Sequence, residues 1–261
     1  MNCSKWFVKA EECFSIKNLF LFHITPEIVN DIETDEKDNY WKYHSFEHIR
    51  QIIQNKYAIP FDAFVGLYTR GELTMAARFA WLLYWIGYER IGIIIGKFDV
   101  DQWKDASLLP SVVHLPMSPR RPNVRLTCSE LFDDVHFPTT QLLDVRTWEE
   151  YSGRTTGYAY VRHAGRIPHF LFDPLDGIYE HLNGDILWND LEDYLRLFST
   201  IHQPNSRIKR IVYMCGTGWR ASLAAIFALE SNLADTITVL DSGWYEWSER
   251  YFQDNLRTIK S

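Results

Sequence analysis

Short apolar runs alternate along the chain with longer segments of helical pattern. Runs of about five apolar residues bounded by turn residues are typical of buried strands. They occur at Phe64–Tyr68, Ile91–Ile95, Gln141–Arg146, Arg210–Met214 and Thr236–Leu240. Segments with apolar residues at helical spacing, or rich in alanine, occur at Leu73–Ile86, Thr127–Phe132, Asn189–Phe198 and Ala221–Leu229. This alternation predicts an α/β fold, with mainly parallel sheets covered by helices on both faces.

A proline-rich segment near the middle of the chain predicts a domain boundary. Leu115–Val124 contains three prolines, and proline both removes a backbone donor and disfavours helix in the residue before it. The strand–turn–helix–strand pattern occurs on both sides of this segment. We therefore expect two related domains in tandem, residues 1–116 and residues 124–261, joined by a linker at residues 117–123.

Composition narrows the class of protein and its partners. Hydrophobic residues make up 46% and charged residues 23% of the 261 residues, which excludes a largely disordered or low-complexity chain. The net charge of −7 argues against sequence-independent nucleic-acid binding, which needs clustered Lys and Arg. No apolar run approaches the roughly 20 residues of a membrane helix, and the first residues lack a signal-peptide pattern. We expect a cytoplasmic protein with no nucleic-acid or membrane partner.

The cysteines raise the question of a reactive thiol. The chain has four, Cys3, Cys13, Cys128 and Cys215, and none forms a C-x-x-C pair. A disulfide framework and a structural zinc site are therefore not expected. We predict free thiols, with no metal and no cofactor.

Of the four cysteines, Cys215 has the sequence position that best suits a reactive thiol. It ends a predicted strand, and a short loop with two glycines leads from it into a predicted helix. The positive end of a helix dipole favours anions and lowers the pKa of cysteines. Glycines let several backbone N–H groups point inward as an anion-binding nest. Arg220 at the end of the loop adds a positive charge suited to an anionic substrate.

The loop residues after Cys215 form the predicted binding cradle: Gly216, Thr217, Gly218, Trp219 and Arg220. Thr217 could donate a hydroxyl hydrogen bond or serve only as a loop residue. Trp219 could line the mouth of the site or have an architectural role. An inert buried cysteine is the alternative for Cys215 itself, but two glycines at a helix start favour a cradle.

Four motifs, in order, carry a resemblance to a known family. They are C-G-T-G-W-R-A-S at Cys215–Ser222, L-D-V-R-T-W-E-E-Y at Leu143–Tyr151, G-R-I-P at Gly165–Pro168 and L-D-S-G-W-Y-E-W at Leu240–Trp247. Together they resemble the active-site loop, opening signature, G-H-I-P-G element and closing element of rhodanese-type sulfurtransferases. The first half is similar to the family more faintly. Phe7–Lys9 resembles a decayed opening signature, and no cysteine lies between Leu67 and Arg78, where the nucleophile would be.

The resemblance implies a tandem protein with a degenerate, non-catalytic first domain and a catalytic second domain. It implies transfer of a sulfane sulfur from a small anionic donor, through a persulfide on Cys215, to cyanide, a small thiol or a protein acceptor. Arg146 and Arg166 are candidates for a cationic rim around the site. For Arg146 the alternative is a structural salt bridge with Glu149 or Glu150.

The donor and the reaction class have further alternatives. Mercaptopyruvate-specific family members tend to carry C-G-[ST]-G-V-T, whereas Trp219-Arg220 stands in place of Val-Thr here. This difference favours a thiosulfate-like or unusual donor. Cysteine-dependent phosphatases and arsenate reductases also use Cys and Arg, but their loops hold five intervening residues, whereas Cys215 and Arg220 enclose four. A persulfide carrier or a binding module that delivers sulfur to a protein is the remaining alternative.

Overall fold

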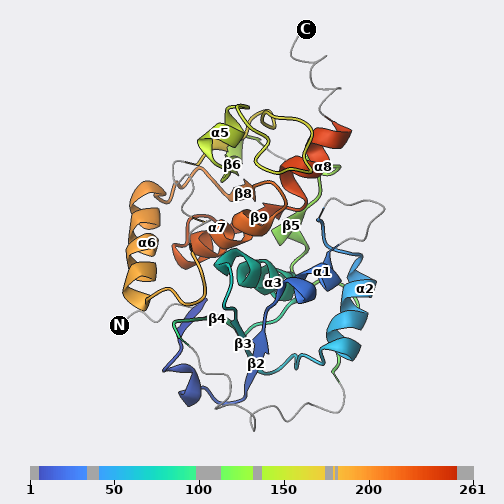
Figure 1. The fold of residues 1–261 in the computed structure, drawn as a ribbon, viewed down its shortest axis with the longest axis vertical. Coiled ribbons are helices and arrows are strands. Elements are labelled where there is room, and N and C mark those ends of the chain that lie inside the picture. The colour runs from blue at the N-terminus through green and yellow to red at the C-terminus, as the bar shows by residue number, and fades with distance from the viewer. Residues whose placement is uncertain are drawn as a thin grey trace. The chain divides into compact units, whose positions relative to one another are not determined.

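The chain divides into two compact units in the computed structural model (Figure 1). The structure describes residues 6–33, 41–97, 113–131, 137–173, 179 and 182–251. The first unit takes residues 1–33, 43–122 and 180–202. The second takes residues 34–42, 123–179 and 203–261.

The first unit is built on a four-stranded parallel sheet with strand order β1-β4-β3-β2. Its strands are β1 (Phe7–Lys9), β2 (Leu19–His23), β3 (Phe64–Tyr68) and β4 (Ile91–Ile95). Its helices are α1 (Pro26–Ile32), α2 (Phe46–Gln51), α3 (Leu73–Ile86) and α6 (Trp188–Ile201), with shorter turns of helix at η1 (Cys13–Ser15) and η2 (Ile52–Lys56). Every residue of β4 is buried, as a continuous apolar run predicts. Helix α3 is apolar and buried along almost its whole length, so it forms the centre of this unit.

The segment that leads into α6 runs along the first unit, although its neighbours in sequence belong to the second. Leu73 N donates to Leu182 O (2.8 Å), Gly184 N donates to Gly71 O (3.0 Å), and Gly96 N donates to Gly184 O (3.1 Å). Gly184 passes so close to the main chain that a Cβ there would lie 1.8 Å from the carbonyl oxygen of Thr69. Only glycine permits this approach.

The second unit is built on a five-stranded parallel sheet with strand order β5-β9-β8-β6-β7. Its strands are β5 (Arg125–Leu126), β6 (Thr140–Asp144), β7 (Leu171–Phe172), β8 (Arg210–Met214) and β9 (Thr236–Leu240). Its helices are α5 (Trp148–Tyr151), α7 (Trp219–Glu230) and α8 (Gly243–Arg250), with short 3₁₀ turns at η4 (Pro122–Val124) and η5 (Phe137–Thr139). Strand β8 lies centrally, and four of its five residues are buried. Its carboxyl end is therefore held firmly between β6 and β9.

The structure confirms the predicted α/β class with two parallel sheets, and it corrects one local prediction. Phe7–Lys9 is not the counterpart of the strand that ends at Asp144. It pairs at the sheet edge with β4, as β5 pairs with β9, whereas β2 occupies the place of β6. Within the predicted helix Thr127–Phe132, residues 128–130 form a turn and Leu131 is helical, and Phe132 lies outside the described residues. The backbone N–H and the hydroxyl of Thr127 both donate to the Glu130 carboxylate at the start of this turn (2.8 and 2.6 Å).

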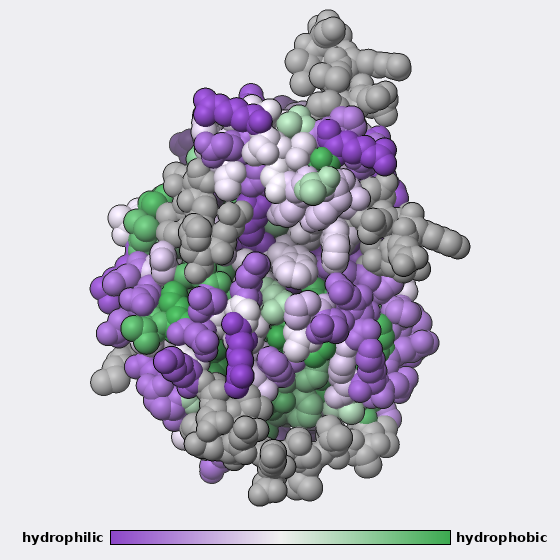
Figure 2. Space-filling view, viewed as in Figure 1, coloured by the Kyte–Doolittle hydropathy of each residue, from purple (hydrophilic) through white to green (hydrophobic). Residues whose placement is uncertain are grey.

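Across the described ranges, no helix is both long enough and apolar enough to cross a membrane. On the face shown in Figure 2, hydrophilic side chains are widespread and hydrophobic ones form smaller groups.

Candidate active site

Cys215 follows β8 directly and begins the short loop that leads into α7 at Trp219. Its side chain is fully buried. Gly218 has φ +92°, a left-handed conformation that glycine adopts readily, and its backbone N–H donates to the Cys215 Sγ (3.1 Å). The sulfur therefore already accepts a hydrogen bond from the loop, at the helix end where the dipole favours negative charge.

The first residues of α8 hold the loop from the other side. Trp244 N donates to Cys215 O (2.8 Å), and Tyr245 N donates to Gly216 O (3.0 Å). Gly243 has φ +48°, and a Cβ there would lie 2.1 Å from the Cys215 carbonyl oxygen. The element Leu240–Trp247 thus fixes the carbonyl groups of the loop and so the orientation of its peptide planes.

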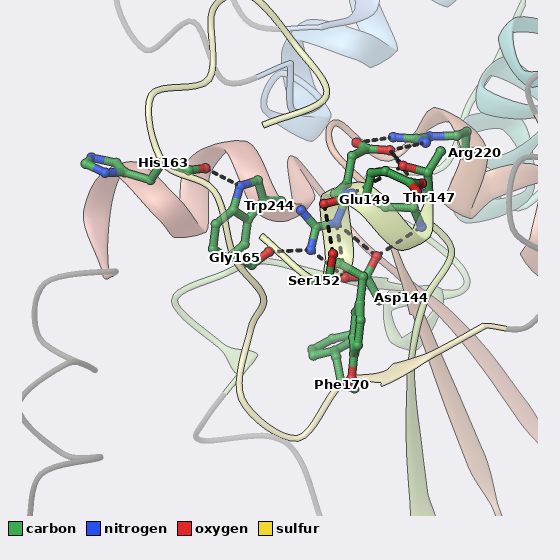
Figure 3. Close-up of polar contacts among 12 residues, drawn as sticks. Asp144, Thr147, Glu149, Ser152, His163, Gly165, Phe170, Arg220 and Trp244 are labelled. Carbon is green, nitrogen blue, oxygen red and sulfur yellow. Dashed lines mark hydrogen bonds and ion pairs between the residues drawn. The ribbon is translucent and has the colours of Figure 1, made fainter. Parts of the chain in front are cut away.

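Arg220 is held in a buried ion pair with Glu150 of α5. Its Nη1 and Nη2 atoms donate to the two carboxylate oxygens at 2.8 and 2.9 Å (Figure 3). The same carboxylate accepts from the backbone N–H and the hydroxyl of Thr147 (3.0 and 3.1 Å), which completes a capping box at the start of α5. Burial opposes ionisation of Glu150, but the hydrogen bonds and charge of Arg220 outweigh it and lower the pKa of this carboxyl.

Arg146 lies in a second buried ion pair, with Asp144 at the end of β6. Both side chains are fully buried, and Nη2 of Arg146 is 2.6 Å from Oδ2 of Asp144. The same nitrogen donates to Gly165 O (2.8 Å), and the guanidinium stacks 4.8 Å from the ring centroid of Trp244 (Figure 3). Its partner is therefore Asp144 rather than Glu149 or Glu150, and it ties the opening signature to the G-R-I-P and closing elements.

The remaining predicted residues take different positions. Thr217 is buried within the loop, and Trp219 is half-buried at the first position of α7. Arg166 is exposed, with its guanidinium 5.1 Å from the ring centroid of Tyr151. The structure thus brings Gly216, Thr217, Gly218, Trp219 and Arg220 together in one loop with Cys215. Of the two rim candidates, Arg166 is exposed and Arg146 is not.

Two site residues were not singled out from the sequence, Glu150 as the partner of Arg220 and Tyr158. The ring of Tyr158 packs on Gly216, where a Cβ would lie 2.1 Å from its Cε2 atom. Its hydroxyl accepts from Nη2 of Arg220 (2.6 Å). The T-x-x-E spacing of Thr147 and Glu150 marks a capping box, whereas no sequence signal indicates Tyr158.

The other described cysteines lie in different surroundings. Cys13 and Cys128 are both buried free thiols. Burial raises the pKa of the Cys13 thiol to about 11 and that of Cys128 well above its usual range. Neither can readily form a thiolate near neutral pH, so Cys128 is poorly suited to resolve a persulfide. Cys3 lies outside the described residues. Within the described part of the chain, no group of three His, Cys, Asp or Glu side chains could hold a metal ion.

The family comparison agrees with this geometry. The family model described as "Rhodanese-like domain" matches residues 127–250, a range that contains the Cys215 loop and both buried ion pairs. The second half of the chain is a rhodanese-like domain. The resemblance to rhodanese-type sulfurtransferases is thereby confirmed.

Curated relatives and solved structures extend the similarity over most of the chain. Thiosulfate sulfurtransferase YnjE of Escherichia coli is 26% identical, over 91% of this chain and 57% of its own length. The 3-mercaptopyruvate sulfurtransferase of Escherichia coli is 24% identical, over 72% of this chain and 66% of its own. The chain therefore spans little more than half the length of YnjE.

The solved structures show the same fold at low identity. The crystal structure of YnjE superposes with a TM-score of 0.66 at 22% identity, over 93% of this chain and 66% of that one. An anaerobic ergothioneine biosynthesis enzyme from Chlorobium limicola, in complex with trimethyl histidine, superposes with a TM-score of 0.69 at 20% identity, over 94% and 68%. This rhodanese fold therefore occurs in enzymes of differing substrates.

Proposed function

We propose that the chain is a sulfurtransferase that moves a sulfane sulfur from a donor such as thiosulfate to a thiophilic acceptor, through a persulfide on Cys215. The observation that carries the proposal is the placement of the Cys215 sulfur, which accepts the Gly218 N–H at the start of α7. A nucleophilic thiolate is favoured by such a position.

In the first step, the Cys215 thiolate attacks the outer sulfur of thiosulfate. An S–S bond forms on Cys215, the S–S bond of the donor breaks, and sulfite leaves with the electron pair. The backbone N–H groups of residues 216–220 stabilise the negative charge of the persulfide, as preorganised donors do for developing charge. Residues of the loop therefore act mainly through their main chain.

In the second step, an acceptor removes the outer sulfur. Cyanide or a thiolate attacks this sulfur, the persulfide S–S bond breaks, and its electron pair returns to Cys215 as thiolate. Thiocyanate or an acceptor persulfide leaves. No external oxidant or reductant is needed, because the sulfur transferred is already at the sulfane level.

The arginines have distinct proposed roles. Arg220 supplies positive charge beside the loop, and its pairing with Glu150 keeps that charge in place. Arg166, which is exposed, remains the candidate cation for attracting an anionic donor. Arg146 acts indirectly, because its ion pair with Asp144 holds the segments that surround the loop.

The first unit is proposed to be non-catalytic. Thr69 follows β3 as Cys215 follows β8, so a hydroxyl stands where the second unit has the thiol. The loop after Thr69 also pairs with residues 182–184, through the hydrogen bonds to Leu182 and Gly184. We keep the cytoplasm as the proposed location, which the free thiols of the described cysteines support.

The test is intact-protein mass spectrometry after brief exposure to thiosulfate, followed by cyanide. Wild type should gain one sulfur atom and lose it as thiocyanate forms. Cys215→Ser should gain none, whereas Cys128→Ser, which removes a buried thiol from the same unit, should behave as wild type. Loading on Cys128 instead of Cys215 would refute the assignment.

The same experiment separates the rival functions. Mercaptopyruvate and polysulfide test other donors, and trimethyl histidine, the natural substrate in the Chlorobium limicola complex, is offered as a further acceptor. A persulfide that forms but is not released to small acceptors would indicate a carrier for a protein partner. Turnover of an aryl phosphate or arsenate without sulfur loading would indicate a phosphatase or arsenate reductase instead.

A further inference from the structure

Tyr158 is the side chain that packs most closely on the loop of Cys215. A Cβ on Gly216 would lie 2.1 Å from Cε2, 2.5 Å from Cζ and 2.6 Å from the hydroxyl oxygen of Tyr158. The hydroxyl end of the ring therefore lies directly over the residue that follows the nucleophile. Tyr158 comes from the irregular segment between α5 and β7, a segment whose role the loop motif alone does not explain.

The hydrogen bonds of Tyr158 show that its hydroxyl oxygen is used as an acceptor, which leaves its hydrogen to be donated. Its oxygen accepts from Nη2 of Arg220 at 2.6 Å, and Arg220 is in turn held by Glu150. A phenol has one hydrogen to donate. Among the residues that the structure describes, we find no acceptor for that hydrogen. It is thus available to a group held at the loop.

The protonation state of Tyr158 suits a donor. Burial raises the pKa of Tyr158, and the charges of Cys215 and Glu150 raise it further, against the opposing effect of Arg220. The phenol therefore stays neutral and keeps its hydrogen throughout the physiological pH range.

The charges around the loop show why a further donor is useful. The guanidinium of Arg220 forms a bidentate pair with Glu150, so much of its positive charge is offset locally. The hydroxyl of Tyr158 is polarised by the same guanidinium, and a hydrogen bond from a neutral group to a charged one is among the stronger kinds. Tyr158 can therefore transmit the effect of Arg220 to the sulfur.

We propose that the Tyr158 hydroxyl, oriented by Arg220, is the side-chain hydrogen-bond donor to the negative sulfur at Cys215. This assignment rests on the proposed role of Cys215 as nucleophile. It explains the absence of a side chain at residue 216, because any Cβ there would displace the ring. It also gives the Glu150–Arg220 pair a part in the chemistry, since that pair positions the tyrosine.

The test compares Tyr158→Phe with Tyr160→Phe in the full chain. Tyr160 packs against Tyr158 with the rings tilted at 31° and the centroids 5.4 Å apart, so its variant loses a hydroxyl from the same group of rings and leaves the Arg220 contact intact. The rate of Cys215 alkylation by iodoacetamide is measured from pH 5 to 10 by peptide mass spectrometry. Tyr158→Phe should raise the pH midpoint of alkylation by about one unit, which is about a tenfold loss of thiolate below the midpoint. Tyr160→Phe should leave the midpoint unchanged.

An unchanged midpoint in Tyr158→Phe would overturn the proposal, and so would equal shifts in both variants. Incorporation of 3,5-difluorotyrosine at position 158 provides a variant that keeps the shape and the hydroxyl. Because its hydroxyl ionises more readily, it should match wild type at low pH and lose its effect as the pH rises. Alkylation does not depend on sulfur transfer, so failure of thiosulfate to load Cys215 would count against the proposed function without affecting this result.

Discussion

Breaking the buried ion pair between Glu150 and Arg220 should lower the free energy of unfolding by a measurable amount. Glu150→Gln keeps the size of the side chain but removes its charge, and its amide offers one oxygen in place of two. The wild-type carboxylate accepts four hydrogen bonds, two from Thr147 and two from Arg220. The substitution therefore leaves a buried guanidinium without its counter-charge.

The expected cost follows from that burial. The side chains of Arg220 and Glu150 are 7% and 3% exposed, so solvent screens the pair little. Removing one partner of a buried pair typically costs about 3–5 kcal/mol, and the remaining bond from Arg220 to Tyr158 places the loss near the lower end, at about 3 kcal/mol. With a urea m-value of about 2 kcal/mol/M, the unfolding midpoint should fall by about 1.5 M.

The matched control is Glu149→Gln, which makes the same change of charge on the same helix at an exposed position. It should alter the free energy of unfolding by no more than about 0.5 kcal/mol. Urea unfolding of the full chain, followed by circular dichroism, measures both variants. The double variant Glu150→Gln, Arg220→Met should lose less than the sum of the single losses, because no buried charge then remains unpaired. A midpoint for Glu150→Gln equal to that of Glu149→Gln would refute the reasoning.

Three further outcomes are expected. Because the pKa of Glu150 is lower in the folded state, its contribution is present above the ordinary glutamate pKa and is lost as the pH falls through the lowered value; wild type should lose more stability than Glu150→Gln between pH 7 and pH 3 in urea titrations. Gly216→Ala should displace Tyr158 and slow Cys215 alkylation at neutral pH at least tenfold, so an unchanged rate would contradict the packing. A fragment of residues 1–122 should show no cooperative thermal unfolding, because it lacks Leu182 and the rest of the segment that pairs with the first unit; a fragment with a sharp transition would disprove this.

The hydrophobic pattern correctly predicted the most buried elements. Strands Phe64–Tyr68, Ile91–Ile95, Arg210–Met214 and Thr236–Leu240 and helix Leu73–Ile86 occur with the predicted bounds, because burial on all sides leaves a continuous apolar run. Where local side-chain hydrogen bonds form, as between Thr127 and Glu130, residues 128–130 form a turn inside a predicted helix. Hydrophobic periodicity does not show side-chain hydrogen bonds of this kind.

The partners of the charged groups were harder to predict than the groups themselves. Cys215 and the loop after it stand out locally, but the carboxylate that holds Arg220 lies 70 residues earlier in the chain. Arg146 pairs with Asp144, two residues away, whereas the carboxylate of Glu150 is taken up by Thr147 and Arg220. Long-range pairing depends on how strands order in the sheet, which the sequence pattern leaves open.

The return of residues 180–202 to the first unit has a consequence for synthesis on the ribosome. Because the stretch between residues 122 and 180 belongs to the second unit, the first unit lacks α6 until residue 202 has been made. Translation at roughly 5–20 residues per second takes about 4–16 s to cover those 80 residues. During that time the edge formed by Gly71 and Thr69 has no partner from its own unit. The nascent chain must therefore hold an incomplete first unit while residues 123–179 of the second unit emerge, which couples the maturation of the first unit to the synthesis of the second.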